Sequence, residues 1–98
     1  MTFEFAAPLW RYPGDGGWYF VSLPIQVSAD ITDIATGLRR GFGSVRVAAT
    51  VGCSSWQTSI FPDSKTGTYM LPVKKTVRAA ERLEAGDDVH ARLELVDL

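Results

Sequence analysis

Apolar residues recur at every second position in three segments of the chain, the period expected of half-buried β-strands. This alternation predicts strands over residues 2–11, 44–51 and 88–97. Within residues 44–51, for example, the valines fall on one face and Arg46 on the other. Three shorter segments are rich in aromatic and β-branched residues, which also favour strands. They predict further strands over residues 18–22, 56–61 and 68–71.

Two other segments show helical periodicity, and each follows a Leu-Pro dipeptide. Apolar residues recur at helical spacing after Pro24: Val27, Ile31, Ile34 and Leu38. Proline suits the first turn of a helix, because its missing N–H would have no partner there, and Gly37 favours a helix end. A second helix is predicted to begin at Pro72, with Val73, Val77 and Ala80 facing inward.

The order of these elements repeats. Each half has a short strand, Leu-Pro, an amphipathic helix, a polar or glycine turn and an alternating strand, so that Leu23-Pro24 corresponds to Leu71-Pro72. Internal repetition constrains the architecture strongly. A chain of 98 residues fits one domain. The sequence therefore predicts a single domain over residues 1–98, with an internal repeat of about 1–52 and 53–98.

The second half carries a recognisable order of motifs. It runs from Tyr69-Met-Leu-Pro72 through Val77–Leu83 and Gly86-Asp87 to Val89–Leu95. This order resembles the swapped-hairpin domain of AbrB-like transition-state regulators and antitoxin DNA-binding domains, which build one barrel from two chains. Two copies in one chain then imply a mainly β fold. The expected architecture is a single-chain, pseudo-two-fold, closed or double-split β-barrel of about six strands, with two short α-helices plugging its ends.

Three longer motifs extend the resemblance to the whole chain. They are "PGDGGWYFVSLP", "GFGSVRV" and "WQTSIFPDSKTGTYMLPVKKTVR". From about Phe3 to Leu95 the chain is similar to a family catalogued as domain of unknown function 1905. The resemblance implies a small bacterial β-barrel, sometimes fused to or associated with a domain of the YdeI/OmpD-associated bacteriocin-protection type. It implies no established activity and supplies no catalytic residues.

Composition narrows the class of protein. The hydrophobic fraction of 46% argues against disorder, and no run reaches the roughly 20 apolar residues of a membrane span. The first residues lack the basic start and apolar core of a signal peptide, and the lone Cys53 forms no internal disulfide. These features predict a cytoplasmic protein with no membrane partner.

Charge is distributed unevenly although the net charge is only −1. Residues 39–78 hold seven basic residues and one acid, and the rest of the chain holds three arginines and ten acids. Arg39 and Arg40 lie in a glycine-bearing loop, and Lys74 and Lys75 lie in the predicted first helical turn, where backbone N–H groups favour anions. This pattern indicates either an anion site or solvated surface charge.

Aromatic residues are numerous for so small a barrel, and most are expected in the core. Within residues 56–61, Trp56, Thr58 and Ile60 share one face, opposite Gln57, Ser59 and Phe61. One face should fill the barrel. The other could line a groove together with Arg46, or it could simply pack at the rim.

These observations favour a binding module for an anionic or amphipathic small molecule, with no cofactor and no metal. The expected ligand-binding residues are Arg39, Arg40, Arg46, Trp56, Lys65, Tyr69, Lys74 and Lys75. A module that binds nucleic acid or a protein partner is the alternative, with nucleic acid disfavoured by the net charge. A cofactor-free enzyme or a biosynthetic or resistance pathway accessory is a further alternative, although Cys53 and His90 form no evident catalytic pair.

Overall fold

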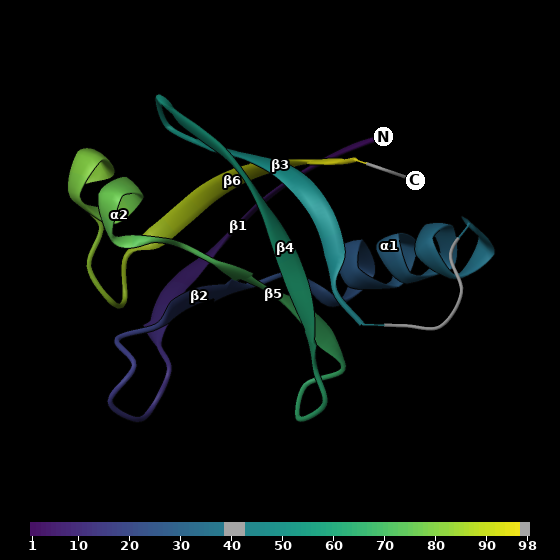
Figure 1. Ribbon diagram of the computed structural model, residues 1–98, viewed down its shortest axis with the longest axis horizontal. Helices are drawn as coiled ribbons and strands as arrows, with labels where there is room; N and C mark the ends of the chain where they lie inside the picture. The colour runs from purple at the N-terminus through teal and green to yellow at the C-terminus, as the bar shows by residue number, and fades with distance from the viewer. Residues whose placement is uncertain (39–42, 97–98) are drawn as a thin grey trace.

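The computed structural model describes residues 1–38 and 43–96. Six antiparallel strands close into a barrel in the order β1-β2-β5-β4-β3-β6 (Figure 1). The strands are β1 (Thr2–Arg11), β2 (Tyr19–Ser22), β3 (Val45–Val51), β4 (Ser54–Asp63), β5 (Thr68–Pro72) and β6 (Asp88–Leu95). The mainly β, six-stranded barrel predicted from the sequence is therefore confirmed.

The two long strands, β1 and β4, each contribute to two sheets. Their first seven residues or so pair with β6 and β3, and β3 pairs with β6. Their last three residues pair instead with β2 and β5, which pair with each other. The barrel consequently consists of two four-stranded sheets that share β1 and β4.

Alternation sets which side chains fill the barrel. In β3 and β6 every second residue is buried, and their polar neighbours Arg46, His90, Arg92 and Glu94 are exposed. Val47, Leu71 and Leu93 have no exposed surface at all. The alternation predicted for β1, β3 and β6 is confirmed, because a period of two places one whole set of side chains on the core side.

Reciprocal hydrogen bonds relate the two halves of the barrel. The Leu23 N–H donates to the Tyr69 carbonyl, and the Val73 N–H donates to the Tyr19 carbonyl, both at 2.9 Å. In this geometry Leu23 is equivalent to Val73. The sequence repeat predicts that the two Leu-Pro dipeptides correspond, but in the structure they are offset by two residues.

The two helices lie on opposite sides of the barrel (Figure 1). They are α1 (Ile25–Leu38) and α2 (Lys75–Glu81). Pro72 does not open α2 as predicted. It belongs to β5 and is paired with Phe20, and the helix begins three residues later. Proline is tolerated there because it stands at the end of its strand.

The helix details agree only in part with the expectation. Gly37 is the penultimate residue of α1, which ends at Leu38 and therefore close to the predicted glycine stop. Ala80 is exposed, so α2 buries only Val77. The helix ends at Arg82, which adopts the left-handed conformation with φ of 56° that usually belongs to glycine.

Strand boundaries shift by a few residues. β2 begins at Tyr19 rather than Trp18, and β4 is longer than predicted because it starts at Ser54 and runs to Asp63. No helix in the described part of the chain is long and apolar enough to cross a membrane.

Candidate functional site

Aromatic rings cover the outside of the barrel over β1 and β2. Because Val21 and Leu71 point into the core, their neighbours Phe20 and Met70 point outward. The Phe20 ring nevertheless has only 7% of its surface exposed. It is covered by three other rings, whose centroids lie 5.4–6.0 Å from its own: Trp10, Tyr12 and Trp18. We call these four residues the aromatic cluster.

The aromatic cluster is partly fixed and partly open. Trp10 Nε1 donates a hydrogen bond of 2.9 Å to Ser22 Oγ, which anchors the indole over β2. Tyr12 and Trp18 are about half exposed, and Phe61 of β4 adds another exposed ring nearby. A shallow hollow of about 280 Å³ lies between these rings and Met70. Exposed aromatic groups of this kind are enriched at binding surfaces.

A larger groove opens beside this cluster, between β4 and the start of α2. It has a volume of about 610 Å³. One side is formed by β4, and the other by the end of β5 and the first turns of α2. We call it the β4–α2 groove and define it by its lining residues: Gly16, Gly17, Trp18, Tyr19, Trp56, Gln57, Thr58, Phe61, Pro72, Val73, Lys74, Lys75 and Arg78.

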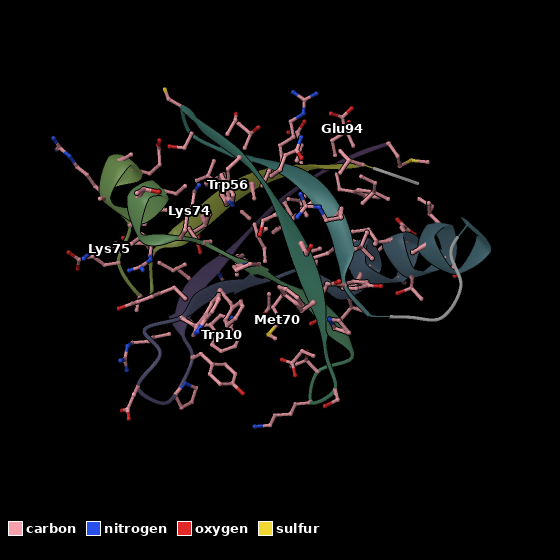
Figure 2. The ribbon with its side chains drawn as sticks, viewed as in Figure 1. Trp10, Trp56, Met70, Lys74, Lys75 and Glu94 are labelled. Atoms are coloured by element: carbon pink, nitrogen blue, oxygen red, sulfur yellow. The ribbon has the colours of Figure 1, made fainter. Side chains whose placement is uncertain are left out.

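The β4–α2 groove is lined by three cations and, among the described residues, by no acidic side chain. Lys74 and Lys75 are exposed, and Arg78 is half-buried. Figure 2 shows Trp56 on the same side of the molecule as both lysines. Because no carboxylate from residues 1–38 or 43–96 lines the groove beside these three cations, their charge favours an anion there.

Arg78 is held in place by two contacts. Its guanidinium lies 3.9 Å from the centroid of the Tyr19 ring, a cation–π geometry. Its Nε donates a hydrogen bond of 3.1 Å to the Val73 carbonyl. At the other end of α2, Ser54 Oγ donates to the Glu81 carboxylate at 2.7 Å. The helix that presents the cations is thereby tied to β4 through Ser54, to β2 through Tyr19, and to Val73, the residue after β5.

A second hollow, of about 670 Å³, lies on the other side of the aromatic cluster. It includes Lys65 and Arg11 together with Asp63, at the turn between β4 and β5. Trp18 and Phe61 line both the β4–α2 groove and the shallow hollow, while Tyr12 and Met70 line both hollows. The three depressions thus form one continuous surface.

The structure gathers only some of the residues predicted for ligand binding. Trp56, Lys74 and Lys75 line the β4–α2 groove, and Lys65 lies in the second hollow. Arg46 does not face the groove, because it points outward from β3 opposite Ser59. The two loop arginines, Arg39 and Arg40, lie outside the described residues.

Tyr69 also lies elsewhere than predicted. It is 8% exposed and belongs to the barrel core. Its backbone N–H donates to the Oγ of Ser28, a buried residue of α1, at 3.0 Å. The alternation of β5 explains this placement, since Tyr69 and Leu71 share the inward face.

Trp18 and Arg78 are among the groove residues that the sequence did not predict for ligand binding. The sequence predicts Trp18 within a strand, but Trp18 stands just before β2 and is 56% exposed. Arg78 is one helical turn after Lys74 and Lys75, so helical spacing could have placed it on their side. Its position over Tyr19 depends on a contact between distant segments, which the sequence does not reveal.

Reactive side chains are dispersed over the rest of the barrel. Cys53 is exposed at the turn between β3 and β4, and His90 is exposed on the outer face of β6. Within the described residues, no group of three His, Cys, Asp or Glu side chains is arranged to hold a metal ion.

A match to a protein family covers most of this architecture. The profile of DUF1905, a domain of unknown function, matches residues 5–93, which include both helices, the four inner strands and most of β1 and β6. The chain belongs to the DUF1905 family. No curated protein matches the sequence. The match confirms the resemblance to this family. The resemblance to AbrB-like domains and the association with a YdeI/OmpD-associated domain stay predictions.

Proposed function

We propose that this DUF1905 domain binds an anionic, amphipathic ligand in the β4–α2 groove. The observation that carries the proposal is the placement of Lys74, Lys75 and Arg78 beside the rings of Trp18 and Trp56, with no acidic residue in the described lining. Ligand sites are typically apolar concavities that contain a few polar groups. A volume of about 610 Å³ falls within their usual range.

The two parts of such a ligand would contribute differently. One ion pair at 4 Å contributes about 1 kcal/mol in water and about 4 kcal/mol near a protein surface. Burial of about 150 Å² of apolar ligand surface contributes roughly 4 kcal/mol, at about 25 cal/mol per Å². Because both lysines are exposed, we expect the apolar part to supply most of the affinity. The cations then select a carboxylate, sulfate or phosphate over a neutral group.

A fluorescent probe with both properties tests the proposal. We expect 1-anilinonaphthalene-8-sulfonate to bind the folded protein, and the double variant Lys74→Glu/Lys75→Glu to weaken that binding about tenfold or more, which corresponds to about 1.4 kcal/mol. The neutral N-phenyl-1-naphthylamine should bind the variant and the wild type equally. Trp56→Ala should weaken both dyes, because it removes apolar lining.

The matched control places a charge reversal outside the groove. Arg46→Glu changes a single charge on the exposed face of β3, and it should leave the affinity for both dyes nearly unchanged. The affinity of a Lys65→Glu variant for the sulfonate dye shows separately whether the dye also binds in the second hollow. Equal affinity of the wild type and the Lys74→Glu/Lys75→Glu variant for the sulfonate dye would refute the proposal.

A further inference from the structure

The first part of β4 has a free edge that faces the β4–α2 groove. Residues 54–60 of β4 pair with β3 on one side. On the other side β4 pairs with β5 only at Phe61, Pro62 and Asp63. Beyond Met70, β5 separates from β4 and continues toward α2, and the groove occupies the space between them.

The hydrogen bonds at the end of β4 show which of its backbone N–H and C=O groups face the groove. The Gly67 N–H donates to the Asp63 carbonyl at 2.8 Å, so the backbone groups of Asp63 point toward β5. Backbone groups of alternate residues point to the same edge of a strand. Those of Gln57 and Ser59 therefore point to the free edge of β4, where Gln57 itself lines the groove. Within residues 1–38 and 43–96, no hydrogen bond reaches these groups from the groove side.

The equivalent edge of β1 differs in one residue. Trp10 pairs with Phe20 as Phe61 pairs with Met70, so Pro8 of β1 is equivalent to Ser59 of β4. The Leu9 N–H and carbonyl bond to Asp87 and Gly86 beside β6, so Pro8 faces the opposite, free edge. Proline presents no N–H there and blocks strand addition. At the same place in β4, Ser59 keeps its N–H.

The groove therefore combines a row of backbone donors and acceptors with a basic, aromatic wall. Residues 55–59 span about 13 Å, at about 3.3 Å per residue. A small anion would satisfy the cations but leave the backbone groups of Gln57 and Ser59 unpaired. An extended polypeptide carries donors and acceptors at the matching spacing, and acidic side chains on it would complement Lys74, Lys75 and Arg78.

We infer that the ligand is an acidic segment of a partner protein, which pairs as an additional strand with residues 55–59 of β4. This inference rests on the proposed function of the β4–α2 groove and assigns a chemical class to its ligand. Main-chain hydrogen bonds would supply register and part of the affinity, as in other cases of strand addition. Trp56 and Phe61 would contact apolar side chains of the segment.

Backbone methylation of a defined peptide tests the inference. The probe is an acetylated, amidated hexapeptide of alternating aspartate and valine with one valine replaced by phenylalanine. Two derivatives are N-methylated at every second amide. The first carries the methyl groups on the odd-numbered residues of the peptide, and the second carries them on the even-numbered residues. Successive amides of a strand face opposite edges, so each derivative is methylated along one edge only. One derivative should therefore lose about tenfold or more in affinity and the other should bind like the parent, measured by isothermal titration calorimetry.

A protein variant provides the complementary measurement. Ser59→Pro removes the N–H that faces the groove and reproduces the β1 edge. Peptide affinity should fall about tenfold or more, while the sulfonate dye should still bind in a Lys74-dependent manner. Amide NMR spectra establish that the variant folds. If the substitution unfolds the barrel, the two methylated peptides with wild-type protein still decide the question.

The outcomes separate this inference from the proposed function. Dye binding that depends on Lys74 and Lys75, without peptide binding, would overturn the strand addition and leave the groove as a small-molecule site. Equal affinity of both methylated peptides would also overturn it. A dimer that forms at this edge, excludes the peptide and is dissociated by Ser59→Pro would assign the edge to a second copy of the chain.

Discussion

Replacement of Leu93 by alanine tests the barrel core and the phase of β6 together. Leu93 lies in the middle of the four-stranded sheet, between Phe3 of β1 and Ala49 of β3, and none of its surface is exposed. Loss of a fully buried leucine side chain usually costs about 2–5 kcal/mol, from lost burial and from the cavity left behind. A domain of this size has a total stability of roughly 5–15 kcal/mol.

The adjacent Glu94→Ala is the matched control. Glu94 is the second-to-last residue of β6, and it is exposed on the outer face of the barrel (Figure 2). Its removal should change the free energy of unfolding by no more than about 0.5 kcal/mol.

Urea denaturation followed by circular dichroism measures both variants. We expect Leu93→Ala to lower the free energy of unfolding by about 3 kcal/mol, with an unchanged dependence on urea concentration. The corresponding fall in Tm is roughly 12–24 °C for a domain of this size. Similar losses for Leu93→Ala and Glu94→Ala, or a larger loss for Glu94→Ala, would refute the inward and outward faces assigned to β6.

Two further substitutions test local features of the fold. Ser28→Ala leaves the buried Tyr69 N–H without its acceptor and should cost about 1–3 kcal/mol, whereas a loss below a few tenths of a kcal/mol in urea denaturation would show that another acceptor replaces Ser28. Arg82→Gly should raise stability by up to about 1 kcal/mol, because Arg82 has a φ of 56° that glycine adopts freely; a lower Tm in a thermal shift assay would contradict that reasoning.

Several parts of this structure follow from the sequence alone. The alternation of β1, β3 and β6 assigns their faces because side chains of a strand have a period of two, and a slip by one residue would expose the whole apolar set. The helical spacing of Val27 and Ile31 predicts α1 for a similar reason. The order of strands and helices then limits the fold to a small barrel.

The candidate site depends on tertiary structure. Both faces of β2 and β5 carry large apolar residues, so local pattern does not show that Tyr69 fills the core while Phe20 lies outside under the aromatic cluster. The β4–α2 groove is lined by residues near positions 17, 57 and 74, which are distant in the chain. They meet only because β4 pairs with β5 over three residues and then separates from it. Where two strands that are distant in the chain stop pairing depends on the whole barrel, and the hydrophobic pattern within one strand does not determine it.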